Sequence, residues 1–266
     1  MIKIEDVHKS FDGLEVLRGT SFEVAKGEIL ALIGGSGSGK SVVLKHVAGL
    51  IRPDKGKVYI DGKDILSLRG DDLEKSRSRL GFLFQSGALF SSFTVFDNVA
   101  FPLREKTQLS DQEIKERVLS VLDHVGLTGA ENKFPAQISG GMIKRTALAR
   151  ELIRNPEIML FDEPTTGLDP VIANAILDVV KSIHRGRGFT GIIVSHELAR
   201  VFKIVQRAAM LHEGVIVATG TPEEILSSKD PIVHQFVTGG IEGPFDPHSV
   251  INTGNSSRGH DMEGTR

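Results

Sequence analysis

Residues 34–41 read Gly34-Gly35-Ser36-Gly37-Ser38-Gly39-Lys40-Ser41, and this stretch decides how the chain folds. It fits the phosphate-binding pattern G-x-x-x-x-G-K-[ST], in which glycines let successive backbone N–H groups point into one concavity. The apolar run 28–33 before it predicts a buried strand, and the run 42–50 after it predicts a helix. A flexible Gly/Ser linker would lack both flanks. We therefore interpret the stretch as a P-loop within an α/β domain.

Each part of the P-loop has a chemical role in holding a nucleotide. Lys40 would reach the β- and γ-phosphates, and the Ser41 hydroxyl would bind Mg²⁺. The N-terminus of the following helix adds positive dipole at the same place. The sequence therefore predicts a site for ATP and Mg²⁺. The residues expected to line the nucleotide here are Gly34, Gly35, Ser36, Gly37, Ser38, Gly39, Lys40, Ser41 and Val42.

A second apolar run, 158–161, ends in the adjacent carboxylates Asp162 and Glu163. Adjacent side chains at a strand end diverge, so one carboxylate can face a metal while the other faces an attacking water. We expect Asp162 to bind Mg²⁺ and Glu163 to act as the general base. Two solvated acids at a strand end are the alternative. A P-loop in the same chain favours the metal site and the base.

The stretch Ser139-Gly140-Gly141 precedes another predicted helix. A hydroxyl and the N–H groups at a helix N-terminus form a further phosphate site. One nucleotide cannot easily use this site and the P-loop of the same chain. We therefore predict a head-to-tail homodimer in which each copy offers its Ser139 loop to the other copy's P-loop.

Composition narrows the possible functions of the 266-residue chain. A net charge of −2, one Tyr and no Trp give little support for nucleic acid as a partner. Cysteine is absent, which excludes disulfides and thiolate metal sites. The N-terminus lacks the pattern of a signal peptide, and no uninterrupted run of 18 apolar residues predicts a membrane span.

The predicted elements divide the chain into two parts. Residues 1–238 form the ATPase domain, in which short hairpins flank the P-loop unit, a helical subdomain covers about 86–154, and strands alternate with helices from 157 to 206. Residues 239–266 are rich in glycine and form an extended tail. The tail is either disordered or docks on a neighbouring chain through Ile241, Phe245, Val250 and Ile251.

Taken in order, these motifs resemble those of the ATP-binding subunits of ABC transporters. In that resemblance Gln85 matches the Q-loop, residues 138–142 the signature, residues 167–169 the D-loop and His196 the switch histidine. It implies a P-loop NTPase fold with a mainly parallel core sheet, an antiparallel β subdomain and a helical subdomain. It also implies an integral-membrane permease as partner. The roles that it implies are hydrolysis for Lys40, Gln85, Glu163 and His196, metal binding for Ser41, Gln85 and Asp162, and nucleotide contact for Phe11, Val16, Ser139, Gly140 and Gly141.

Two further strings, 84–90 and 95–103, resemble the Mla-type lipid-transport ATPases. This narrower resemblance implies an MlaE-type permease, an MCE-domain protein and phospholipid movement across a double-membrane envelope. The chain would then lie on the cytoplasmic face of the inner membrane. Met142 departs from the usual signature Gln, so the polar side chain that the resemblance implies against the partner's nucleotide is absent at this position.

Three other readings remain beside this one. An ABC transporter for another cargo would keep every motif. A soluble ABC protein acting on ribosomes or DNA would require a second cassette or a long coiled coil, which this sequence does not contain. A small-molecule P-loop kinase would leave Ser139 and His196 without a role.

The segment after Gln85 is rich in phenylalanine. Phe90 and Phe93 lie in a predicted loop, where exposed aromatic rings favour a binding surface. We expect these two to line the groove that receives the permease. Phe96 and Phe101 lie on a predicted helix, and for both we expect a place in the core of the helical subdomain.

Overall fold

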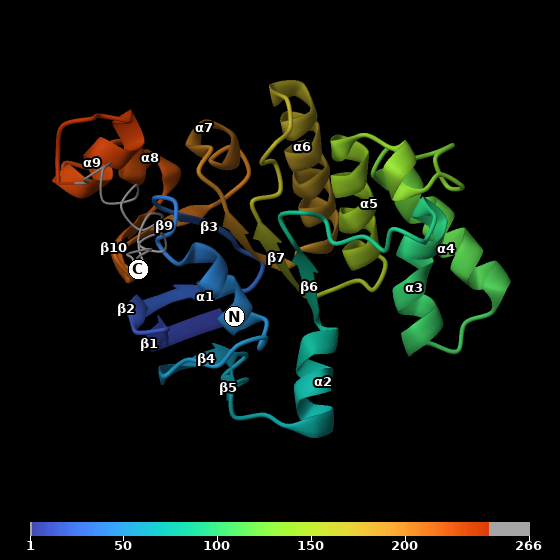
Figure 1. Ribbon diagram of the computed structural model, residues 1–266, viewed down its shortest axis with the longest axis horizontal. Coiled ribbons are helices and arrows are strands. Elements are labelled where there is room, and N and C mark those ends of the chain that lie inside the picture. Colours follow the sequence, from blue (N-terminus) through green and yellow to red (C-terminus); the bar gives the residue numbers. More distant parts are fainter. Residues whose placement is uncertain (1, 245–266) are drawn as a thin grey trace, which may run out of the picture.

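The computed structural model describes residues 2–244 and contains two β-sheets surrounded by helices (Figure 1). In these residues the larger sheet has six strands in the order β10-β9-β3-β8-β7-β6, and every neighbouring pair is parallel except β9 and β10. This confirms the predicted α/β fold with a mainly parallel core sheet. Its strands are β3 (Ile29–Ile33), β6 (Leu80–Leu83), β7 (Ile158–Asp162), β8 (Thr190–Val194), β9 (Arg207–His212) and β10 (Val215–Gly220).

The central strands of this sheet are buried on both faces, which explains their continuous apolar sequences. Successive side chains of a strand point to opposite faces. In β3, Ile29, Ala31 and Ile33 pack into a core shared with the helices, whereas Leu30 and Leu32 pack into a core shared with α1 (Lys40–Val47) and the smaller sheet. The six-stranded sheet therefore separates two hydrophobic cores.

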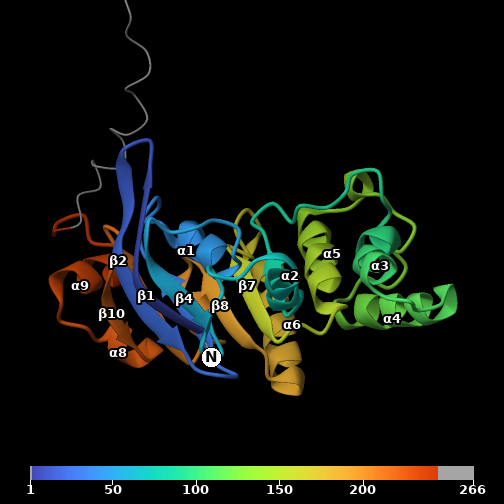
Figure 2. The ribbon, with the colours of Figure 1, turned by 90° about the horizontal axis from the view of Figure 1, so that it is seen from below.

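The smaller sheet is antiparallel and has the order β2-β1-β4-β5 in the described residues. It is built from the predicted hairpins on either side of the P-loop unit. Its strands are β1 (Ile2–Phe11), β2 (Leu14–Val24), β4 (Lys55–Ile60) and β5 (Lys63–Asp64). Helix α2 (Gly70–Ser78) follows it and leads into β6. Figure 2 shows this sheet beside α1.

Helices α3 (Val95–Lys106), α4 (Asp111–His124) and α5 (Gly140–Leu152) lie together at one end of the molecule in both views (Figures 1 and 2). Their N-termini are fixed by side-chain caps. Ser110 and Glu113 form the predicted capping box of α4, and Ser139 caps α5 by accepting a hydrogen bond from the Met142 N–H. A short 3-10 helix, η1 (Pro135–Gln137), connects α4 to α5.

The remaining helices cover the core sheet and close the described chain. They are α6 (Pro170–Arg187), α7 (Leu198–Val201), α8 (Pro222–Leu226) and α9 (Pro231–Thr238). Asp169 caps α6, as its position before Pro170 predicts. Among residues 2–244, no helix is long and apolar enough to cross a membrane.

The predicted tail begins directly after α9, which ends at Thr238 with Gly239 in the left-handed conformation. Ile241 is 83% exposed. The other tail residues for which docking is predicted, Phe245, Val250 and Ile251, lie outside the described residues.

Two adjacent glycines begin α5 in different surroundings. A Cβ atom added to Gly141 would lie 2.4 Å from Cγ2 of Ile172, which is too close for any real contact. A Cβ atom on Gly140 would lie 3.5 Å from Cδ2 of Leu168, an ordinary van der Waals distance. Gly141 therefore allows the first turn of α5 to approach α6, whereas Gly140 is not required for this packing.

These surroundings predict opposite effects of two alanine substitutions on stability. Gly141→Ala forces the β-branched Ile172 to move, and we expect it to lower the free energy of unfolding by about 1–3 kcal/mol. Gly140→Ala should leave it unchanged or raise it by up to about 1 kcal/mol, because alanine favours a helix more than glycine does. Urea unfolding of the full chain measures both values. Equal effects of the two substitutions would contradict the close packing of α5 on α6.

Candidate functional site

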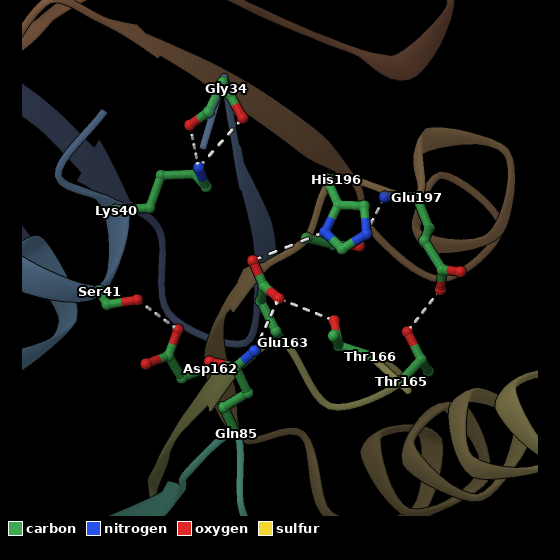
Figure 3. Close-up of polar contacts among 12 residues, drawn as sticks. Gly34, Lys40, Ser41, Gln85, Asp162, Glu163, Thr165, Thr166, His196 and Glu197 are labelled. Carbon is green, nitrogen blue, oxygen red and sulfur yellow. Dashed lines mark hydrogen bonds and ion pairs between the residues drawn. The ribbon is translucent and has the colours of Figure 1, made fainter. Parts of the chain in front are cut away.

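Most of the residues expected to bind and hydrolyse a nucleotide meet where four parallel strands end (Figure 3). The P-loop follows β3, Gln85 follows β6, the two carboxylates end β7, and His196 follows β8. These strands are neighbours in the sheet, so residues far apart in the sequence lie at one edge. Ligands of open α/β sheets bind at this carboxyl edge.

The P-loop depends on glycines at its two ends. A Cβ atom on Gly34 (φ +145°) would lie 2.1 Å from the Leu211 carbonyl oxygen of β9. A Cβ atom on Gly39 (φ +99°) would lie within 3.0 Å of side-chain atoms of Leu17 and Val16. Only glycine fits either place. The predicted nucleotide contact Val16 therefore lies against the P-loop.

The Lys40 ammonium lies in the concavity of the P-loop. Its Nζ donates to the Gly34 carbonyl at 3.0 Å and the Gly35 carbonyl at 2.6 Å, and it lies 3.4 Å from Ser38 Oγ (Figure 3). Burial lowers the pKa of Lys40, against the attraction of the carboxylates Glu163 and Asp162. The cation is therefore close to the place where the backbone N–H groups of the loop would cradle phosphates.

A hydrogen bond joins the P-loop helix to the acidic end of β7. Ser41 Oγ donates to Asp162 Oδ1 at 2.7 Å, and burial raises the pKa of the Asp162 carboxyl. Residues 2–244 hold no cluster of three or more acidic, histidine or cysteine ligands. A hydroxyl and one carboxylate beside a phosphate cradle suit Mg²⁺, which takes few protein ligands and several phosphate or water oxygens. The residues present thus fit the predicted metal.

Glu163 turns away from Asp162, as predicted for adjacent carboxylates. Its backbone is left-handed, with φ +47°, and its N–H donates to the Val194 carbonyl at the end of β8. Gln85 Nε2 donates to Glu163 Oε2 at 3.2 Å, and His196 Nδ1 lies 3.5 Å from Oε1 (Figure 3). The structure therefore brings the expected base, Gln85 and His196 together around one carboxylate.

Sequence analysis missed two hydroxyls that support this arrangement. Thr166 Oγ1 donates to Glu163 Oε2 at 2.7 Å, and Thr165 Oγ1 donates to Glu197 Oε2 at 2.6 Å (Figure 3). The second bond connects the turn after β7 to the loop that carries His196. The spacing of Glu163 and Thr166, three residues apart across a turn, is a local signal that could have revealed the first bond.

The remaining predicted nucleotide contacts lie apart from the P-loop. Ser139, Gly140 and Gly141 begin α5, and within residues 2–244 no hydrogen bond joins them to residues 34–41. Phe11 is 42% exposed at the end of β1, with the Lys9 ammonium 5.4 Å from its ring centroid. A single chain therefore assembles the P-loop side of the site and leaves the Ser139 loop outside it.

A surface aromatic cluster lies further along the chain after Gln85 and consists of Phe90, Phe93 and Phe101. The ring centroids are 5.1 Å apart for Phe90 and Phe93 and 4.9 Å apart for Phe90 and Phe101. Phe101 was expected in the core, and this prediction was wrong, because its position on α3 turns it toward the loop and leaves it part-exposed. Phe96 is partly buried against the core, as expected.

Comparison with known proteins extends these observations. The sequence profile of a family described as ABC transporter matches residues 17–166. The intermembrane phospholipid transport system ATP-binding protein MlaF of Haemophilus influenzae is 42% identical over 224 residues, which cover 84% of this chain and 85% of that protein. The probable ribonucleotide transport ATP-binding protein mkl of Mycobacterium leprae is 41% identical over 244 residues, which cover 92% of this chain and 70% of that protein.

A solved structure agrees with the fold. The dimeric ATP-binding cassette MJ0796, in a post-hydrolysis state bound to ADP and Pi, matches with a TM-score of 0.77 and 32% identity over 84% of this chain and 99% of that one. The predicted family fold, with a mainly parallel core sheet, an antiparallel sheet and a group of helices, is thereby confirmed. Together with the P-loop and the acidic end of β7, these similarities show that the chain belongs to the ABC transporter family, as an ATPase subunit similar to those of the Mla type.

Proposed function

We propose that this chain powers phospholipid transport with an MlaE-type permease and an MCE-domain protein, from the cytoplasmic face of the inner membrane of a double-membrane envelope. The observation that carries the proposal is the 42% identity, over 84% of the chain, to a protein named for intermembrane phospholipid transport. The resemblance of residues 84–90 and 95–103 to Mla-type ATPases supports it.

Hydrolysis depends on residues at the carboxyl edge of the core sheet. Lys40 would bind the β- and γ-phosphates, and Ser41, Asp162 and Gln85 would hold Mg²⁺, which would supply the positive charge that neutralises phosphate charge. Glu163 accepts the proton of the attacking water. His196 Nδ1 lies 3.5 Å from Glu163 Oε1, whereas Gln85 binds the other oxygen of this carboxylate. From there the imidazole would help to position the γ-phosphate. Phosphoryl transfer depends mostly on such positioning and on charge stabilisation.

Two copies of the chain bind two ATP molecules between them. The Ser139 loop has a capping hydroxyl and helix N–H groups but no bond to its own P-loop, so it is available to the γ-phosphate held by a second copy. The dimeric state of the similar cassette MJ0796 supports this arrangement. Phe11 is exposed at the end of β1, where its ring is free to stack on the adenine of a bound nucleotide.

A different cargo is the second candidate. The similarity to a protein named for ribonucleotide transport, at 41% identity, favours it. Both candidates use the same ATPase site, because the cargo is recognised by the permease. Only a transport measurement separates them.

The test is ATP-driven lipid transfer by the purified complex in vesicles, with an MCE protein as acceptor or donor. Transfer and ATP hydrolysis should both fall at least about 100-fold in Glu163→Gln, because an amide binds like a carboxylate but cannot accept the proton. Glu157→Gln is the matched control. Glu157 precedes the first residue of β7, at the end of the strand away from Glu163, and pairs with Arg79. Its variant should therefore keep both lipid transfer and ATP hydrolysis.

Two outcomes would count against parts of this proposal. A complex that hydrolyses ATP but moves another solute and no lipid would exclude phospholipid as the cargo, and the ATPase function would still stand. Near wild-type hydrolysis by Glu163→Gln would remove Glu163 as the base.

The surface aromatic cluster provides the proposed contact with the permease. Phe90 is 43% exposed, more than the other two rings of the cluster. The Arg150 guanidinium lies 5.9 Å from the centroid of the Phe90 ring. Aromatic side chains, including phenylalanine, and arginines are enriched at protein interfaces.

Phe90→Ala should therefore weaken co-purification with the permease by at least about tenfold in affinity, a usual effect of removing an interface anchor. ATP binding by the isolated subunit should stay unchanged. Leu226→Ala is the control, since Leu226 is equally an exposed apolar residue but lies on α8 at the other end of the molecule (Figure 1). If Phe90→Ala kept wild-type affinity for the permease, the surface aromatic cluster would be excluded as the contact with the permease.

A further inference from the structure

Helix α5 contributes two buried cations that contact the loop following β6. We call residues 85–88 the Gln85 loop. Lys144 is 6% exposed and Arg150 is 8% exposed, although both side chains usually lie at a protein surface. Neither belongs to the P-loop or to the acidic end of β7, and the predicted roles of the motifs do not account for them.

Both cations bind backbone carbonyls of the Gln85 loop. Lys144 Nζ donates to the Gln85 carbonyl, and it lies 3.5 Å from the Glu163 carbonyl. Arg150 donates to the Ala88 carbonyl at 2.7 Å and to the Gly87 carbonyl at 3.2 Å. Helix α5 therefore holds three of the four carbonyls of this loop.

The loop has a conformation that its own sequence does not favour. Gly87 has φ +79°, and Ala88 has φ +45°, a left-handed backbone that is unfavourable for alanine. A Cβ atom on Gly87 would lie 3.1 Å from Ile143 Cγ2, so the loop lies directly on α5. Such a conformation persists where surrounding contacts fix it, and here charged hydrogen bonds from α5 supply those contacts.

A lysine at position 144 is costly unless its charge has a purpose. Burying an ammonium group loses its hydration, and this burial lowers the pKa of Lys144; two carbonyls and the carboxylates of Asp162 and Glu163 offset part of that loss. An apolar side chain of the same length would pack without that cost. The contact with the Gln85 and Glu163 carbonyls thus accounts for a charged side chain at position 144.

We propose that Lys144 is a positioning residue that fixes the backbone of Gln85, so that Gln85 Nε2 reaches the Glu163 carboxylate. This inference rests on the proposed roles of Gln85 and Glu163. Because Ser139 caps α5, the same helix connects the loop offered to the partner's nucleotide with the residues that activate water in its own chain.

The test compares three substitutions at position 144 by steady-state ATP hydrolysis of the full-length chain in its purified complex with the permease. Lys144→Met removes the charge and the donor, and it should lower kcat about 10- to 100-fold while the KM for ATP stays within about threefold. Lys144→Gln keeps a hydrogen-bond donor without the charge, and its kcat should lie between those of Lys144→Met and the wild type. Lys144→Arg keeps both and should restore kcat to within about threefold of wild type. If Lys144→Met does not fold, the difference between Arg and Gln still provides the test.

Arg145→Met is the matched control. Arg145 is the next residue of α5 and also donates to backbone carbonyls, but those of Val125 and Gly126 beyond α4. Its kcat should remain close to wild type. An equal loss in Arg145→Met and Lys144→Met would show a general effect of α5 and would overturn the inference, as would wild-type kcat in Lys144→Met.

A double substitution tests whether Lys144 acts through Gln85. In a Gln85→Ala background the contact with Glu163 is already lost, so adding Lys144→Met should lower kcat less than about threefold. The same fold-loss in both backgrounds would overturn the proposed route. Absence of ATPase activity from the wild-type complex would overturn the proposed function and this inference together, whereas wild-type activity in Lys144→Met would overturn only the inference.

Discussion

The hydrogen bond between Ser41 and Asp162 connects the two halves of the site on which the rest of this structure depends. Ser41 belongs to the helix that follows the P-loop, and Asp162 ends a strand two positions away in the core sheet. The bond can form because β3, β8 and β7 are parallel and end at one edge. Reversing any of these strands would move its functional end to the opposite side of the molecule. The parallel order of the sheet is thus the physical condition for the chemistry.

Burial on both sides of that sheet holds the edge in place. The antiparallel sheet and α1 cover one face, and the longer helices cover the other, so neither face of β3 or β7 meets water. The P-loop glycines allow the backbone to pass close to β2 and β9 without steric conflict. The loop is therefore part of the packed fold, and its conformation does not depend on a nucleotide alone.

Sequence analysis could predict the elements whose signals are local. A glycine-rich turn between an apolar run and a helix, an acidic pair after a strand, and Ser110 three residues before Glu113 each carry their meaning within a few residues. The sequence could not show that Lys144 reaches the Gln85 carbonyl, because 59 residues separate the two and only the packing of α5 on β6 brings them together. Phe101 was misplaced for the same reason. Its helical spacing is compatible with the core, and the loop that its ring contacts is set by tertiary structure.

We propose that one chain holds half of each ATP site and that a second copy completes it. The absence of cysteine from the sequence allows a direct measurement. One tagged copy would carry Ser36→Cys at the exposed tip of the P-loop, a second copy would carry Ser139→Cys, and both would carry Glu163→Gln to prevent turnover. Mixed with ATP and Mg²⁺ under mild oxidation, the two copies should form a disulfide-linked heterodimer, and this product should disappear without nucleotide. A disulfide that forms only when both cysteines are in the same chain would contradict the account.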